Sequence, residues 1–227
     1  MQDAGLFSRP DDQNNAWCIT CDGIGGLPGG KEAATICIET LDRFFKESRT
    51  METTESIPDF IRLGMLPVQD AFYTHIEKGQ RHVQMGCAMA LAYFEAAKAC
   101  FAWCGDARIY HFRKGKVIFN SLPHNPVFDE YRAGKISLQQ ANRKNTHVIT
   151  RSFSASDAFP LLEFHTAGIR QGDRVMVCTD GVWKTLEIME FAALATTKNM
   201  NSMIGSINLK LQKEATDNYW GWLGLLE

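Results

Sequence analysis

Four short acidic motifs occur along the chain in a fixed order, and their aspartates could together bind hard divalent cations. Each aspartate stands at the end of an apolar run of the kind that forms a β-strand. Cations such as Mg²⁺ and Mn²⁺ prefer oxygen ligands, above all carboxylates. The motifs are Asp22-Gly23-Ile24-Gly25-Gly26, Gly105-Asp106-Ala107-Arg108, Asp180-Gly181 and Asp217-Asn218. The sequence therefore predicts a metal site assembled from distant segments.

Each motif has a simpler interpretation when it is taken alone. Asp-Gly is a common turn dipeptide, so a single Asp-Gly pair is more often a turn than a metal ligand. Asp106 lies two residues before Arg108, and such a pair can form a surface ion pair of little energetic value. Only the joint occurrence of the four motifs favours a metal site.

The composition of the chain argues against several classes of partner. With 227 residues, 45% of them hydrophobic, we expect a single domain over residues 1–227. The formal net charge is -2 and no long run of Lys or Arg occurs, which argues against nucleic acid and anionic membranes as partners. No apolar stretch approaches the roughly 18 to 20 residues of a membrane span, and no signal peptide is recognisable. We therefore expect a cytoplasmic protein, and we take a monomer as the expected oligomeric state.

The seven cysteines predict reduced thiols. Their number is odd and they are scattered through predicted strands and helices, unlike the paired framework of a small secreted domain. Cys18 and Cys21 form a C-x-x-C motif, and Cys100 with Cys104 forms a looser pair, so a structural zinc ion is an alternative. Packing of small thiols in a buried strand is the favoured interpretation, because Cys18 lies within an apolar run.

The elements that must position the aspartates follow from hydrophobic periodicity and turn residues. A strand at residues 16–20 delivers Asp22 into a glycine-rich turn. Helices are predicted at residues 31–46, from Pro67 through 76, after a capping box at Ser137, and at 187–198 and 202–215. An antiparallel meander is predicted from runs at 86–94, 99–104, 109–113 and 117–120, with further strand signals at 147–152, 161–166, 174–179 and 219–226. Strands in meanders and helices in separate blocks indicate an α+β fold.

The ordered motifs resemble those of the metal-dependent protein serine/threonine phosphatases of type 2C, particularly their compact bacterial branch. The resemblance runs from about Ser8 to the C-terminus, and it includes Gly86-Cys87-Ala88 at a strand start and residues 123–137 as the flap region. It implies a four-layer αββα sandwich with two central antiparallel β-sheets.

The resemblance also implies an activity and a set of site residues. By this resemblance, a water activated between two Mn²⁺ or Mg²⁺ ions would hydrolyse phosphoserine and phosphothreonine in proteins that a bacterial serine/threonine kinase has phosphorylated. Asp22 would bridge both ions, and the carbonyl of Gly23 would complete one of them. Asp180 and Asp217 would hold the other ion. Asp106 would belong to a weaker third ion or support the other ligands.

The segment from Ser8 to Asn14 resembles the family's entry motif, with one departure. In this alignment Arg9 would clamp the substrate phosphate with its planar guanidinium group. Gln13 and Asn14 stand where the family often has acids, and their amides would bind a cation less strongly. A shift of one or two residues could instead bring Asp11 or Asp12 into that role.

Two other functions remain open at this point. A catalytically weak or inactive relative could bind a phosphoprotein or a regulatory partner through the same cleft, and Gln13 and Asn14 are the support for it. A metal hydrolase of an unrelated fold is the third interpretation, and it requires that the aspartates lie far apart.

Overall fold

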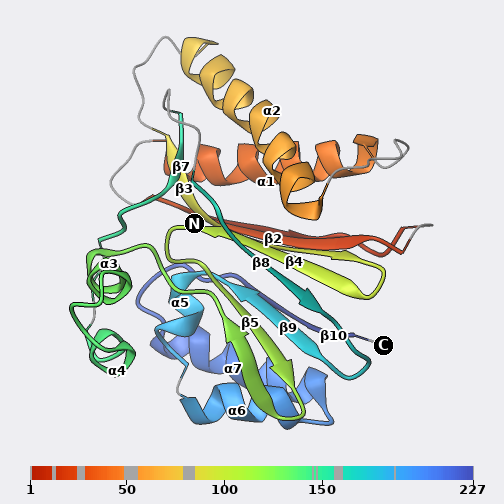
Figure 1. Cartoon of the computed structure of the whole chain (residues 1–227), viewed down its shortest axis with the longest axis vertical. Coiled ribbons are helices and arrows are strands. Elements are labelled where there is room, and N and C mark those ends of the chain that lie inside the picture. The colour runs from red at the N-terminus through yellow and green to blue at the C-terminus, as the bar shows by residue number, and fades with distance from the viewer. Residues whose placement is uncertain are drawn as a thin grey trace.

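Two antiparallel sheets stack on one another, and helices cover the outer face of each (Figure 1). The computed structural model describes residues 2–11, 14–24, 29–48, 56–78, 85–144, 146, 148–155, 161–186 and 188–226. The layers follow the order helices, sheet, sheet, helices. This arrangement confirms the predicted four-layer αββα sandwich.

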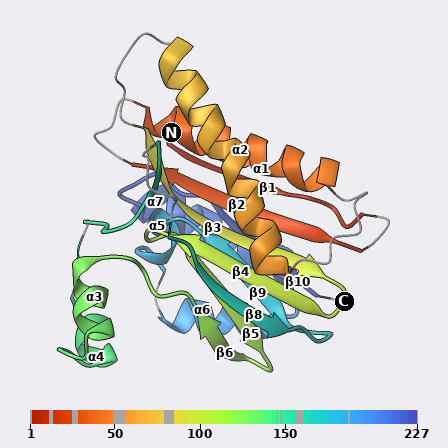
Figure 2. The same cartoon turned by 45° about the horizontal axis from the view of Figure 1, so that its top comes forward.

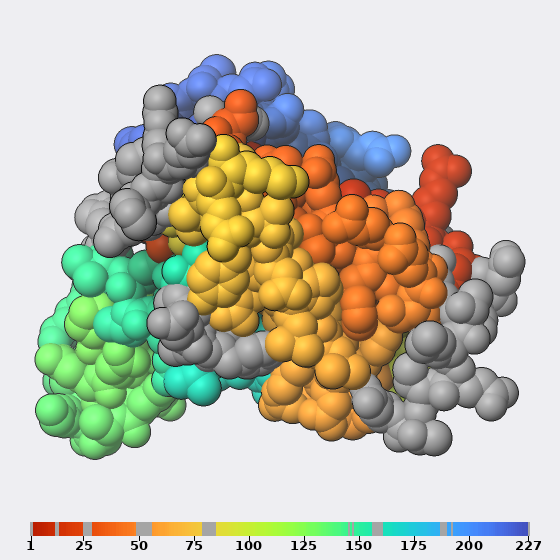
Figure 3. Space-filling model, turned by 90° about the horizontal axis from the view of Figure 1, so that it is seen from above, coloured from red at the N-terminus to blue at the C-terminus, as the bar shows by residue number. Residues whose placement is uncertain are grey.

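The first sheet consists of six strands, and four of them come from the N-terminal half of the chain. Its strands are β1 (Asp3–Phe7), β2 (Ala16–Gly23), β3 (Gly86–Glu95), β4 (Lys98–Cys104), β7 (Phe153–Ser154) and β8 (Glu163–Gly168). Their order is β1-β2-β3-β4-β8, with β7 paired to β3. Helices α1 (Gly30–Ser48) and α2 (Ile57–Lys78) cover its outer face, and Figure 3 shows them from outside.

The second sheet consists of four strands in the order β10-β9-β5-β6. They are β5 (Arg108–Arg113), β6 (Lys116–Asn120), β9 (Arg174–Cys178) and β10 (Gly221–Leu225). Helices α6 (Ile188–Thr196) and α7 (Met200–Glu214) cover its outer face. Three short helices, α3 (Pro126–Arg132), α4 (Leu138–Ala141) and α5 (Asp180–Trp183), complete the fold, and α3 and α4 project to one side (Figure 2).

Strand β3 shows how the sequence builds two cores at once. Successive side chains of a strand point to opposite faces of the sheet. Cys87, Met89 and Leu91 pack against the helices, whereas Ala88, Ala90 and Ala92 face the second sheet. Small alanine side chains on the inner face let the two sheets approach closely.

The predicted meander is wrong in one respect, because its strands belong to different sheets. The chain leaves the first sheet after β4 and enters the second at β5. The crossing begins at Gly105, whose φ is 91° and where an added Cβ would lie 2.5 Å from the Cβ of Ala88. A glycine is required here because of both the positive φ and the close packing on β3.

Two further predictions of elements need correction. Helix α2 begins ten residues before Pro67 and continues through it. The proline removes the hydrogen bond to the carbonyl of Leu63, which lies on an exposed turn where water can replace it, since Leu63 is 42% exposed. The strand predicted at residues 147–152 is absent at 148–152, and pairing begins only at Phe153; residue 147 lies outside the described residues.

Other predictions from the sequence are confirmed. Ser137 and Gln140 form the predicted capping box of α4. All seven cysteines are buried and free. Along the described part of the chain, no helix combines the length and the apolar character that crossing a membrane requires.

Candidate metal centre

Five aspartates from separate chain segments are brought together at one edge of the sandwich. Asp3 is the first residue of β1 and Asp22 lies near the end of β2. Asp106 lies in the crossing between β4 and β5, Asp180 follows β9, and Asp217 lies between α7 and β10. Their charges influence one another, as the raised pKa values of several of them show.

Asp3 and Asp22 form a directly opposed carboxyl pair. They are partners in the antiparallel register of β1 and β2, and their side chains hydrogen bond to each other. Burial, followed by the charges of Asp3 and Asp180, raises the pKa of Asp22 to about 10. Burial also raises the pKa of Asp3, although Thr179 Oγ1 donates a hydrogen bond of 2.6 Å to Asp3 Oδ2. Two carboxylates this close do not both ionise readily without a cation.

Asp180 and Asp217 lie on two segments that are in backbone contact. A Cβ added to Gly181 would lie 2.0 Å from the carbonyl oxygen of Asn218, so only glycine permits this approach. Asp180 is 6% exposed, and its Oδ1 has no hydrogen-bond partner among the described residues. Its Oδ2 contacts the ammonium group of Lys184. Asp217 is exposed, and its Oδ1 accepts a hydrogen bond of 2.8 Å from the amide of Asn218.

Asp106 is fixed by its backbone to the segment that carries Asp180. Trp183 Nε1 donates a hydrogen bond of 2.9 Å to the carbonyl of Asp106, and the guanidinium group of Arg108 lies over the Trp183 ring, 3.6 Å from its centroid. Burial and the charge of Asp180 raise the pKa of Asp106 to about 6, against the opposing effect of Lys184.

The backbone at Gly23 is packed as tightly as that at Gly181. A Cβ on Gly23 would lie 2.3 Å from the carbonyl oxygen of Gly30, so the end of β2 touches the start of α1. The amide of Ile24 donates a 3.0 Å hydrogen bond to the carbonyl of Gly86. These contacts hold the strand end that carries Asp22, and the role predicted for the Gly23 carbonyl stays a prediction.

The donor set fits hard divalent cations. A buried carboxylate oxygen without a partner is costly, and Asp180 Oδ1 is such an atom among the described residues. A divalent cation would supply the missing partner and lower the raised pKa values. No three of the described carboxylates lie within 4.8 Å of one another. Ligands divided between two ions about 4 Å apart would not need to do so.

The structure does not bring the predicted entry motif to these aspartates. The amide of Ser8 bonds to the carbonyl of Trp17, which lies five residues before Asp22, or roughly 16 Å along an extended strand. Arg9 and Asn14 lie beyond this point, in the turn of the β1–β2 hairpin, and both are exposed. The described structure therefore does not place Arg9 and Asn14 with these aspartates, and the roles of Arg9 as a phosphate clamp and of Asn14 as a metal ligand stay predictions.

The alternative alignment, in which Asp11 or Asp12 takes the acidic position, is described by the structure only at Asp11. Asp11 closes the hairpin turn, because its Oδ1 accepts a 2.6 Å hydrogen bond from the amide of Asn15. Gln13 and Asp12 lie outside the described residues. Asp3 is a carboxyl group beside Asp22 that the sequence reasoning missed.

A signal for Asp3 was present in the sequence. An acid at the start of one strand and an acid at the end of the next strand lie at the same edge when the two strands form a hairpin. Asp3 precedes the short run of residues 4–7, and Asp22 ends the following strand. The run is short and contains Gly5, so it lacks the length of a clear strand pattern.

A cavity of about 700 Å³ borders the segments that carry Asp106 and Asp180, although neither aspartate lines it. Arg108, Trp183 and Lys184 line it on the side of Asp106 and Asp180, and residues of the segment that carries α3 and α4 line the other side. That second side contributes the cationic residues Arg143 and Lys144. Its surface therefore complements an anionic ligand.

Comparisons with known proteins agree on one family. A sequence model described as Protein phosphatase 2C matches residues 1–214. The serine/threonine phosphatase stp of Listeria monocytogenes serovar 1/2a is 23% identical over 195 residues, which cover 86% of this chain and 76% of that protein.

Solved structures of similar proteins share the fold. The serine/threonine phosphatase Stp1 from Staphylococcus aureus has a TM-score of 0.84 at 19% identity, with 100% of this chain and 89% of that chain covered. The catalytic domain of the serine threonine protein phosphatase PstP, solved in complex with two manganese ions, has a TM-score of 0.71 at 19% identity and covers 99% of this chain and 98% of its own.

Proposed function

This chain belongs to the protein phosphatase 2C family, and we propose that it hydrolyses phosphoserine and phosphothreonine in proteins with the help of two Mn²⁺ or Mg²⁺ ions. The observation that carries the proposal is the convergence of aspartates from both sheets at one edge, with Asp180 Oδ1 buried and unpartnered among the described residues. The manganese ions in the PstP structure support the choice of cation.

The positions of the aspartates suggest a division of roles. Asp22 faces the carboxylates of the second sheet and would lie between the two cations, with the Gly23 carbonyl on one of them. Asp180 and Asp217, on contacting segments, would hold the other cation. Asp106 would support a weaker third ion. When bound, the cations supply the positive charge that polarises the phosphoryl group and lowers the pKa of a water molecule.

Asp3 is the addition that the structure makes to this set. Its carboxyl group contacts Asp22 and accepts the hydroxyl hydrogen bond of Thr179. We assign to it the positioning of the Asp22 carboxylate, because a group that orients a ligand affects metal affinity almost as much as the ligand does.

The cationic cavity is the proposed binding site for the phosphorylated substrate. Arg108 takes over the phosphate contact that the sequence suggested for Arg9. It lines the cavity, stacks on Trp183, and its Nε is buried without a hydrogen-bond partner in the described structure. Arg143 and Lys144 would attract the rest of a phosphoprotein, which we propose to be the product of a bacterial serine/threonine kinase.

A weak or inactive phosphoprotein-binding relative remains the second candidate, on different grounds from those in the sequence. Asn14 no longer supports it, since this residue lies in the hairpin turn. The contact of Lys184 with Asp180 does support it, because an ammonium group competes with a metal ion for the same carboxylate.

One assay separates the two candidates. The purified chain is given p-nitrophenyl phosphate and a phosphothreonine peptide, with and without Mn²⁺. The proposal expects turnover that depends on Mn²⁺ and is lost in Asp22→Asn. Binding of the peptide without any Mn²⁺-dependent turnover at high enzyme concentration would establish the binding module instead.

A further inference from the structure

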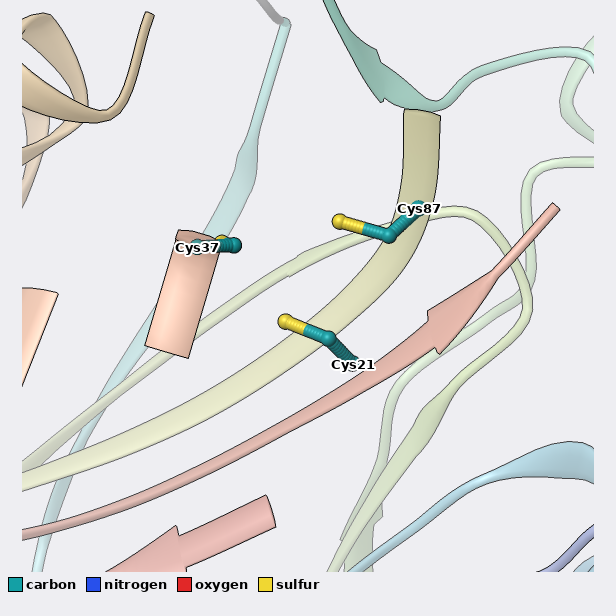
Figure 4. Close-up of side chains that lie close together, drawn as sticks. All are labelled: Cys21, Cys37 and Cys87. Atoms are coloured by element: carbon teal, nitrogen blue, oxygen red, sulfur yellow. The ribbon is translucent and has the colours of Figure 1, made fainter. Parts of the chain in front are cut away.

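Three cysteines form a second cluster of possible metal ligands, on the opposite face of the first sheet from the second sheet. Cys21 on β2, Cys37 on α1 and Cys87 on β3 have sulfur atoms that all lie within 4.8 Å of one another. All three side chains are completely buried. Figure 4 shows the sulfur atoms of Cys21 and Cys87 directed toward Cys37.

The sheet register explains why these thiols meet. Cys21 is the register partner of Met89, and Cys87 is the partner of Gly23. Cys21, Cys87 and Met89 therefore share the face that is covered by α1. A fourth sulfur belongs to the same place, because Cys37 Sγ lies 3.9 Å from the Sδ of Met89.

The donor set selects one class of cation. The ligand atoms are sulfur only, and the surrounding residues form the apolar core between the first sheet and its helices. Hard cations prefer oxygen, and structural zinc is almost always held by four thiolate, imidazole or carboxylate ligands. Three thiols with a thioether beside them suit a soft monovalent ion.

We propose that Cys21, Cys37 and Cys87 bind one Cu⁺ ion, with Met89 beside it. On binding, the S–H bond of Cys37 breaks, a sulfur–copper bond forms, and the proton passes to solvent. The other two thiols keep their protons and their sulfur atoms contact the ion more weakly than the Cys37 thiolate does. One thiolate and one Cu⁺ ion cancel in charge, so the apolar core receives no net charge, whose burial would be costly.

The geometry requires only a small contraction. Three sulfur atoms placed around an ion at about 2.3 Å are about 4 Å apart, whereas the thiols here are separated by at most 4.8 Å. Hydrogen bonds from Cys21 and Cys87 lower the pKa of Cys37 to about 5, although burial opposes this effect. This direction agrees with Cys37 as the thiol that loses its proton.

Cys18 provides a matched control for the experiment. It is also completely buried and lies on the same strand, but it packs into the core between the two sheets. A Cys18→Ala variant thus removes a thiol of equal burial without touching the cluster. Because the cluster is covered by α1, ion entry requires a local opening, and samples should be equilibrated until the signal is constant.

The test is a titration of the full chain, first freed of metal and kept without oxygen, with Cu⁺ held by a competing chelator. Thiolate-to-copper absorption in the ultraviolet and copper content after gel filtration are measured. We expect one Cu⁺ per chain, release of one proton, and a rise in melting temperature. Cys18→Ala should behave as the unsubstituted chain does, and Cys37→Ala should bind at least about a hundredfold more weakly.

Three results would overturn the proposal. The first is no copper on the unsubstituted chain after equilibration. The second is equal affinity in Cys37→Ala, shown by circular dichroism to be folded. The third is an equal loss in Cys18→Ala. If Cys37→Ala does not fold, Cys87→Ala is substituted for it under the same criteria. Phosphatase activity is not a readout here, so the result does not depend on the proposed function.

Discussion

The two ends of strand β9 each carry a buried aspartate, and the two aspartates have opposite surroundings. Asp173, before the strand, is 1% exposed and accepts hydrogen bonds from Arg113 at 2.6 and 2.8 Å, from the amide of Arg170 at 3.0 Å, and pairs with His111 Nε2 at 2.9 Å. Asp180, after the strand, has one unpartnered oxygen among the described residues and lies among other carboxylates.

The difference separates an aspartate that stabilises the fold from the aspartates of the proposed cation site. Burial alone would raise the pKa of Asp173, but hydrogen bonds from Arg113 and His111 lower it to about 2. In the group of aspartates around Asp180, burial and neighbouring carboxylates raise the pKa of Asp22, on β2, to about 10. Hydrogen-bond donors surround Asp173, whereas other carboxyl groups surround Asp22. The aspartates around Asp22 can therefore all be ionised only when positive charge is added.

The largest effect on activity is expected from a substitution in the group of aspartates around Asp180. Asp22→Asn should lower kcat/KM by about a thousandfold or more, because it removes a carboxylate from the proposed cation site. The free energy of unfolding should stay about equal, since the Asn amide can donate to Asp3 the hydrogen bond that the protonated Asp22 carboxyl group donates. Kinetics with Mn²⁺ and urea unfolding measure both, and activity within tenfold of the unsubstituted chain would contradict the comparison.

Asp173→Asn should show the reverse pattern. The substitution leaves Arg113 and His111 without their carboxylate, so the free energy of unfolding should fall by about 3 kcal/mol. Activity at a temperature where the variant is folded should stay within about twofold. A variant that is fully stable but inactive would place Asp173 in the active centre and end the distinction between the two ends.

Acid should weaken the end of the molecule that carries Asp173. Its pKa is lower in the folded chain than the ordinary 3.8, so its carboxylate stabilises the fold above about pH 4. That stabilisation, about 2 kcal/mol, is lost as the pH falls through about 2. Urea unfolding at pH 5 and pH 3 measures the first part of this loss, and the share of the change due to this residue should be missing in Asp173→Asn.

Lys184 makes the surroundings of Asp180 more similar to those of Asp173, because it gives Asp180 one cationic partner. Lys184→Met should tighten Mn²⁺ binding by about tenfold, since the ion no longer competes with an ammonium group. Calorimetric titration measures the affinity. Lys46→Met is the matched control, because Lys46 pairs with Asp42 at the same i,i+4 spacing on an exposed helix surface; an equal change in both variants would show a general effect of charge.

The smallest effect is expected at the hairpin turn. Arg9→Ala should change KM for a phosphothreonine peptide by less than about twofold, whereas Arg108→Ala should raise it by about tenfold. The two variants remove the same charge, so the difference between them reports position alone. If Arg9→Ala raised KM as much as Arg108→Ala does, Arg9 in the hairpin turn would also have to contact the substrate phosphate.

The sequence predicted those site residues that a local pattern of neighbouring residues marks, and it missed one that depends on pairing between strands. Asp22 and Asp180 were recognisable because an apolar strand leads into each Asp-Gly pair. Asp3 was missed because β1 is short, and without that strand the acidic position was sought beyond it, at Gln13 and Asn14. The pairing of β1 with β2 decides which residue lies opposite Asp22, and a local sequence pattern does not contain that information.

The same limit explains the errors in the fold. Runs of alternating residues identified β3 to β6, but they do not state to which sheet each strand belongs, and the crossing at Gly105 depends on its contact with Ala88. Helix α2 passes through Pro67 because the carbonyl that loses its partner is near solvent. Each error concerns long-range packing, which overrides local preference.

Thr179 ties the proposed centre to the docking of one sheet on the other. Its hydroxyl donates to Asp3 of the first sheet, while its amide donates to the Trp220 carbonyl beside β10 of the second. The proposed catalytic groups are therefore divided across a seam, with neither sheet holding a complete set. A small shift of one sheet relative to the other would separate these groups without disturbing any helix or strand. Loss of turnover should therefore report a disturbed sandwich before a change in secondary structure content does.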